Sequence, residues 1–62
     1  MEKIIKIFMR NYEMTRQEAK DYFYEMQSLV MEAVENGDIW EVDNILADYG
    51  LEPDYVMDVV GF

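Results

Sequence analysis

The sequence predicts an all-α fold: one domain, residues 1–62, built as a small bundle of three main helices and a short C-terminal helix. Three observations lead to this prediction. Apolar residues recur at helical spacing in separate segments of the chain. Capping residues and glycines mark where these segments begin and end. A chain of 62 residues, 52% of them hydrophobic, provides enough apolar surface for one small core and too little for two.

The first predicted helix covers residues 2–12. Its two sides differ sharply: one carries Lys3, Lys6 and Arg10, and the other consists of Ile4, Ile5, Phe8, Met9 and Tyr12. Glu2 and Lys6 have the i, i+4 spacing of a helical ion pair. A strand through Ile4–Phe8 is the competing interpretation, because β-branched residues are concentrated there, but the helical pattern fits better. We expect the basic side to face solvent or the carboxylates of a neighbouring helix or subunit.

The central helix, residues 16–35, organises the rest of the chain. Thr15 and Glu18 have the spacing of a capping box, worth roughly 1 kcal/mol, and Asn36-Gly37 predicts the end of the helix. An apolar arc of about 140° contains Ala19, Tyr22, Phe23, Met26, Leu29, Val30, Ala33 and Val34. Nearly opposite lie Glu18, Asp21, Glu25, Ser28, Glu32 and Glu35. Tyr24 and Met31 fit neither side, so they belong either to a core or self-association contact or to an exposed partner surface.

Two further helices are predicted after Gly37. Asp38 and Glu41 suggest a second capping box, followed by the apolar side Ile39, Val42, Ile45, Leu46 and Tyr49. Gly50 ends this helix, with Leu51 placed against Leu46 as in a Schellman motif. Pro53 begins a short last helix that packs inward through Tyr55, Val56, Val59 and Val60. Trp40 lies off the apolar side. It either covers the rim of the core or the last helix, or is an exposed anchor for a partner.

The charges are distributed very unevenly along the chain. The net charge is −9, and all five basic residues fall within the first twenty positions. Residues 21–62 contain eleven acidic residues and no basic one, so this part cannot neutralise itself. It is therefore not expected to bind nucleic acid or an anionic membrane. A helix-turn-helix DNA-binding protein is disfavoured for the same reason.

The composition also argues against catalysis. The chain contains no histidine and no cysteine, and its only serine, Ser28, has no base near it in the pattern. No glycine-rich loop could hold a phosphate, and Asp38–Asp43 lacks the ligand spacing of a calcium loop. We expect no enzymatic activity, no cofactor and no metal site. Neither a membrane span nor a secretory signal is recognisable, so a cytoplasmic protein is expected.

The acidic side either keeps the protein soluble or binds a partner. Two features favour binding. Asp21 and Glu25 repel each other at i, i+4, and Glu32, Glu35 and Asp48 oppose the negative ends of helix dipoles. A regular row of carboxylates presents negative charge as a nucleic-acid backbone does. We therefore predict a protein partner with a basic surface, contacted by Asp21, Tyr24, Glu25, Met31, Glu32, Glu35, Trp40, Glu41 and Asp48.

Three segments resemble small acidic helical proteins of phages and prophages of Gram-positive bacteria: MTRQEAKDYFYEM, EAVENGDIWEVDNILADYG and LEPDYVMDVV. The shared features are a Met-Thr-x-x-Glu-Ala helix start, a Gly-Asp turn and a Gly-Leu-x-Pro-Asp-Tyr turn, and they cover roughly residues 14–60. The resemblance implies a phage accessory role in the host cytoplasm, in a group that includes anti-CRISPR and other anti-defence inhibitors. It supplies no catalytic residues. The basic first helix departs from a pure nucleic-acid mimic.

A second hypothesis is a structural or regulatory homo-oligomer, such as a homodimer. Its copies would meet through Met9, Tyr24, Met31 or Trp40, and the acidic side would simply be solvated. The two hypotheses differ in what the carboxylates do, because only the first gives them a partner.

Overall fold

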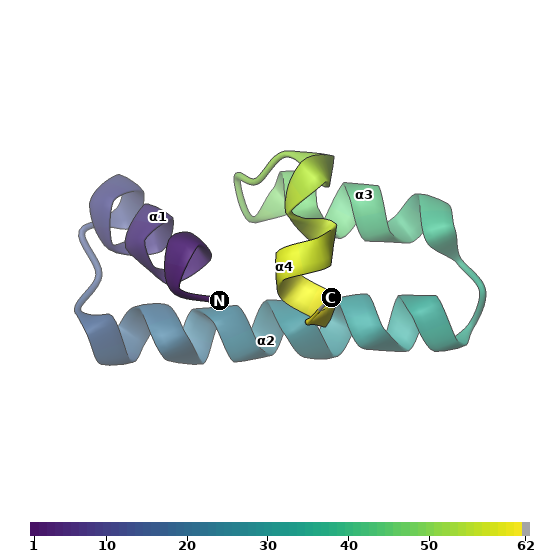
Figure 1. Ribbon diagram of the computed structural model, residues 1–62, viewed down its shortest axis with the longest axis horizontal. Helices are drawn as coiled ribbons and strands as arrows, with labels where there is room; N and C mark the ends of the chain where they lie inside the picture. The colour runs from purple at the N-terminus through teal and green to yellow at the C-terminus, as the bar shows by residue number, and fades with distance from the viewer. Residues whose placement is uncertain (62) are drawn as a thin grey trace.

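The computed structural model describes residues 1–61, and within them it contains helices joined by short turns (Figure 1). Helix α1 covers Glu2–Tyr12, α2 covers Arg16–Glu35 and α3 covers Ile39–Asp48. A single 3-10 turn, η1 at Pro53–Tyr55, leads into the short helix α4 at Val56–Val60. The predicted all-α class, with three main helices and a short fourth, is confirmed. Across residues 1–61, no helix has the length and apolar character needed to cross a membrane.

Helix α2 is the axis on which the other helices pack (Figure 1). Helix α1 lies over its N-terminal half, α3 runs back over its C-terminal half, and α4 lies between them on the same side. The molecule is longest along α2, at 33 Å against 18 and 16 Å in the other directions. Helix α1 and the turn between α2 and α3 are therefore at opposite ends.

The core follows the predicted apolar sides, with corrections at their edges. Buried side chains come from every helix: Ile4, Ile5, Phe8, Ala19, Phe23, Met26, Val30, Ala33, Val42, Ile45, Leu46, Leu51 and Val59. Four residues predicted on the apolar sides are exposed instead, Leu29 to 42%, Tyr12 to 44%, Val34 to 48% and Ile39 to 72%. Tyr12 is the last residue of α1, and its hydroxyl donates a hydrogen bond to the Tyr49 carbonyl. Leu29 and Val34 lie at the two edges of the α2 arc, and the packed helices cover only its middle. Ile39 begins α3 at the very end of the molecule, where little of α2 remains to cover it.

The predicted capping box at the start of α2 is confirmed. The Thr15 hydroxyl accepts a hydrogen bond from the Glu18 N–H at 3.2 Å, and the Glu18 carboxylate accepts one from the Thr15 N–H at 2.8 Å. At the end of α2, Gly37 adopts φ +74°, and the Asp38 N–H donates to the Ala33 carbonyl at 2.9 Å. The same arrangement recurs where Leu51 donates to the Leu46 carbonyl, so the predicted Schellman motif is present.

The predicted capping box at Asp38 and Glu41 is wrong. Asp38 precedes α3, but its side chain accepts no capping hydrogen bond. Its backbone N–H, which Glu41 would have capped, is already donated to Ala33 in the motif that ends α2. The Glu41 N–H, which the Asp38 side chain would have accepted, donates instead to the Asp38 carbonyl at 3.1 Å. Asp38 therefore joins the two helix ends through its backbone and not through its side chain.

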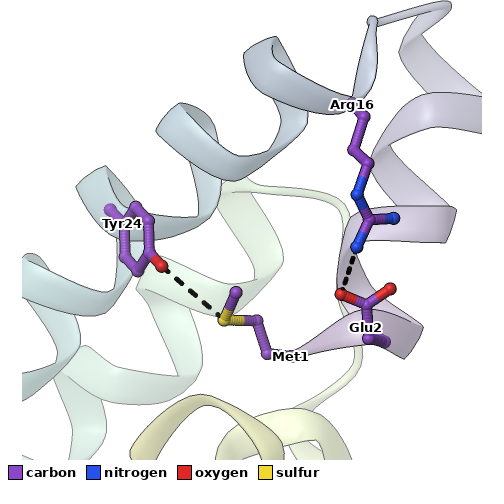
Figure 2. Close-up of polar contacts among 4 residues, drawn as sticks. All are labelled: Met1, Glu2, Arg16 and Tyr24. Atoms are coloured by element: carbon purple, nitrogen blue, oxygen red, sulfur yellow. Dashed lines mark hydrogen bonds and ion pairs between the residues drawn. The ribbon is translucent and has the colours of Figure 1, made fainter.

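The predicted Glu2–Lys6 pair is replaced by a pair between helices. Arg16 Nη2 lies 2.5 Å from Glu2 Oε1, and this hydrogen bond holds the pKa of Glu2 below its ordinary value (Figure 2). Nearby, the Tyr24 hydroxyl lies 3.9 Å from the Met1 sulfur. Both contacts join the beginning of α1 to α2. They are solvent-exposed, so they position α1 more than they stabilise it.

Candidate functional site

A groove runs between the C-terminal half of α2 and α3. It encloses about 340 Å³ and is lined by Leu29, Glu32, Ala33, Asn36, Asp38, Glu41, Ile45 and Asp48. We call this set of residues the acidic groove. Ala33 and Ile45 are buried and belong to the core, and Leu29 is partly exposed beside them. The groove therefore has an apolar floor with carboxylates around its edge.

The local sequence explains why the groove forms. On α2 its residues are spaced at i, i+3, i+4 and i+7, and on α3 and its cap at i, i+3, i+7 and i+10, so each set forms one stripe along its helix. The short turn at Gly37 folds α3 back beside α2 and brings the two stripes face to face. Small side chains at Ala33 and Asn36 leave the space between the helices unfilled.

Within residues 1–61, no positive charge lies opposite these carboxylates. The nearest basic residue in the sequence is Lys20, and the one ion pair within residues 1–61, Glu2–Arg16, joins the N-terminal ends of α1 and α2. The last turns of α2 and α3 also contain no basic residue to compensate their helix dipoles. The acidic groove is thus a concentration of negative charge that the described chain leaves unopposed.

Glu25 extends this negative surface along α2. Burial raises the pKa of the Tyr49 hydroxyl, and the negative charge of Glu25 raises it further. The pKa of the Tyr22 hydroxyl is also raised. Burial is the main cause, and the charges of Tyr12 and Glu25 raise it further. Glu25 therefore lies close to both tyrosines, next to the place where α3 ends.

The predicted site residues divide into two groups. Glu32, Glu41 and Asp48 come together in the acidic groove, and Glu25 lies on the same side of α2. Asp21 is one turn earlier on that side and accepts a hydrogen bond from Gln17 Nε2 at 3.0 Å. These five carboxylates form one acidic surface across two helices.

The remaining predicted residues lie elsewhere. Tyr24, Met31 and Glu35 are on the side of α2 turned away from the acidic groove, and the two apolar ones are 48% and 41% exposed. Trp40 is 82% exposed, so it does not cover the rim of the core. Tyr24, Met31 and Trp40 are therefore outside the core, and they do not contribute to the groove.

Sequence reasoning missed five groove residues by assigning them other roles. The pattern predicts Leu29, Ala33 and Ile45 in the core, Asn36 at the end of α2 and Asp38 as a helix cap. The stripe that continues from Leu29 through Glu32 and Asn36 across the turn to Asp38 and Glu41 is the signal that could have identified them. Reading it required knowing which sides of α2 and α3 meet.

No three acidic residues within residues 1–61 converge closely enough to hold a metal ion. Comparison of the chain with models of protein families, with curated proteins and with solved structures finds no match. The function of the chain is therefore inferred from the geometry and charge of its surface.

Proposed function

We propose that this chain is a non-enzymatic interaction module that occupies the cationic nucleic-acid-binding surface of another protein and thereby inhibits it. One observation carries this proposal: four carboxylates border a single groove, Glu32 on α2, Glu41 and Asp48 on α3 and Asp38 just before α3, and no cation of the described chain pairs with them. Unpaired charges of one sign on a rigid surface attract a partner of opposite charge and accelerate its association.

The spacing of the charges supports mimicry of a nucleic-acid backbone. Glu25 and Glu32 are seven residues apart on α2, about 10 Å at the helical rise, and so are Glu41 and Asp48 on α3. Glu41 and Asp48 thus form one row of negative charge along the groove, and Glu25 and Glu32 form a second row along α2, of which Glu32 borders the groove. Two such rows resemble the two phosphate backbones of a duplex. Helix α1, with its basic residues, lies over the N-terminal half of α2 and away from the groove, so it leaves this surface unneutralised (Figure 1).

The resemblance to phage accessory proteins suggests the setting. In that setting the target is a host or defence protein in the host cytoplasm, such as a CRISPR nuclease, and the chain acts as an acidic inhibitor. No cofactor takes part, because binding alone blocks the target.

A structural or regulatory homo-oligomer is the second candidate. It is favoured by the exposure of two neighbouring large apolar side chains, Ile39 and Trp40, at the end of the molecule. Large exposed apolar residues are typical of contact surfaces. In this alternative the acidic groove is solvated.

A capture experiment with matched variants tests the first candidate. The groove variant carries Glu32→Gln, Glu41→Gln and Asp48→Asn. The control variant carries Glu13→Gln, Asp43→Asn and Glu52→Gln, which remove the same charge from exposed positions outside the acidic groove. Proteins retained from a host lysate by each immobilised variant are then challenged with duplex DNA.

The wild type and the control variant should both retain a DNA-binding protein that duplex DNA releases. The groove variant should not retain it. Retention of the same protein by the groove variant, or its persistence in the presence of DNA, would count against mimicry.

A further inference from the structure

We propose that the acidic groove of one copy receives the basic side of α1 from a second copy, so that the chain associates head to tail. This inference goes beyond the proposed function because it concerns the chain alone and needs no other protein. It rests on two complementary surfaces that lie at opposite ends of the same molecule.

The basic side of α1 is available for contact. Ile4, Ile5 and Phe8 turn toward the core, which directs Lys3, Lys6 and Arg10 outward. None of these three forms an ion pair within residues 1–61. Lys3 Nζ lies 5.9 Å above the ring of Tyr55, so Lys3 already has a contact in the chain. Lys6 and Arg10 therefore carry most of the proposed interaction.

The acidic groove fits such side chains chemically. Lysine and arginine have apolar stems and charged ends, and they place both favourably where an apolar floor is bordered by carboxylates. Leu29, Ala33 and Ile45 supply the floor, and the carboxylates supply charge-assisted hydrogen bonds, to which arginine contributes in bidentate form. The lengths are compatible: Lys6 to Arg10 spans four residues, about 6 Å, and fits within Glu41 to Asp48, which spans seven residues, about 10 Å.

The chain cannot fill its own groove. Helix α1 packs on the N-terminal half of α2, the acidic groove lies along the C-terminal half, and α4 lies between them (Figure 1). The buried residues Ile4, Ile5 and Phe8 hold α1 in that place. Only a second copy can bring the two surfaces together without unfolding the core.

The geometry sets the form of the assembly. Donor and acceptor surfaces are different, so each added copy leaves one free α1 and one free groove, and the assembly grows as a chain or closes as a ring. The net charge of −9 repels whole copies, but that repulsion is screened beyond about 8 Å at physiological salt. Contacts within the groove are closer than this and persist until molar salt screens them.

Sedimentation velocity of the full chain tests the proposal with two half-site variants. The donor variant, Lys6→Gln with Arg10→Gln, keeps the acidic groove. The acceptor variant, Glu41→Gln with Asp48→Asn, keeps the basic side of α1. The control for the acceptor variant carries Asp43→Asn and Glu52→Gln. It loses the same amount of negative charge, but at positions outside the acidic groove. All are compared from micromolar to millimolar concentration, in physiological and in molar salt.

The wild type and the control should associate into species larger than a dimer in physiological salt and dissociate in molar salt. Each half-site variant alone should associate at least about tenfold more weakly than the wild type. Their equimolar mixture should form heterodimers and stop there, because only one intact pair of surfaces remains. This recovery also demonstrates that both variants are folded.

A wild type that stays monomeric over the whole range would overturn the proposal. Undiminished association of either half-site variant would overturn it too, and would point to the apolar residues near Trp40. An equimolar mixture of the two half-site variants that does not associate would also overturn the proposal. None of these results depends on a basic partner, so they are distinct from a failure of the capture experiment.

Discussion

Tyr12 connects three helices through one side chain. Its ring lies 5.9 Å from that of Tyr22 in α2, and its hydroxyl donates a hydrogen bond to the Tyr49 carbonyl at the end of α3, at 3.2 Å. A Cβ atom at Gly50 would come within 2.5 Å of that hydroxyl. Gly50 is therefore required both by its φ of +76° and by the approach of Tyr12.

Gly50→Ala should destabilise the protein more than Gly37→Ala. Gly37 has a similar φ of +74° but nothing within 4 Å of an added Cβ, so its substitution costs about 1 kcal/mol of backbone strain. Gly50→Ala adds the displacement of Tyr12 and its hydrogen bond, roughly another 1 kcal/mol. Urea denaturation measures the free energy of unfolding of both variants. In a Tyr12→Phe background the two substitutions should become nearly equal, and an undiminished difference would contradict this explanation.

Glu18 makes the capping of α2 dependent on pH. The hydrogen bonds from Thr15, the backbone one first, lower the pKa of Glu18 below its ordinary value of 4.5. The folded state thus binds this proton less readily than the unfolded state, so the stabilisation is complete above pH 4.5 and is lost as the pH falls through the folded pKa. The stability difference between the wild type and Glu18→Gln should be largest at about pH 7 and shrink as the carboxylate is protonated. A difference that stays constant down to about pH 3 would contradict this.

At the scale of elements, α4 depends on α2. Five residues are too few to form a stable helix alone. Val59 is fully buried, and Gln27 Nε2 donates to the Val59 carbonyl at 2.8 Å. This hydrogen bond is the polar contact that fixes α4 across the middle of α2.

Gln27→Ala should loosen α4 selectively. Hydrogen exchange at Val59 and Val60 should accelerate by about fivefold, as expected for losing roughly 1 kcal/mol of a hydrogen bond, while exchange in the middle of α2 stays unchanged. Gln17→Ala removes an exposed glutamine contact on the same helix and is the matched control. Equal acceleration throughout the chain would mean that α4 does not open independently.

The boundaries of the helices could be predicted from sequence because local chemistry sets them. Thr15, Gly37, Gly50 and Pro53 act on their immediate neighbours and take the same roles in the structure. The cap predicted at Asp38 was wrong because the end of α2 competes for its backbone N–H, a conflict between two local rules. Glu13 gave no signal at all for the left-handed conformation, φ +55°, in which it ends α1.

Burial at the edges of the helices, and the acidic groove itself, could not be predicted in the same way. Leu29 and Val34 satisfy the apolar period of α2 as well as Val30 does, and only the position of the packed helices distinguishes them. The sequence identified Glu32, Glu41 and Asp48 one by one. That they share one groove is a consequence of the side on which α3 folds back.

At the scale of the whole molecule, the chain separates its charges. Basic residues are confined to α1 and the first part of α2, and the acidic groove lies at the other end. The proposed inhibition of a basic partner and the proposed head-to-tail association both depend on this separation of charge. Their common premise is that the groove carboxylates pair with no cation within residues 1–61 and that their mutual repulsion opposes folding, which is typical of residues kept for binding.

Thermal unfolding of the groove variant, Glu32→Gln with Glu41→Gln and Asp48→Asn, tests this premise most directly. At low ionic strength and micromolar concentration, relief of repulsion and of the unfavourable helix-dipole interactions of Glu32 and Asp48 should outweigh the loss of the favourable one of Glu41 in the first turn of α3. The chain should therefore be stabilised by roughly 0.5 kcal/mol, and Tm should rise by about 2–4 °C. The control variant, Glu13→Gln with Asp43→Asn and Glu52→Gln, should gain less. A groove variant with a lower Tm than the wild type would show that these carboxylates support the fold, and would contradict the premise.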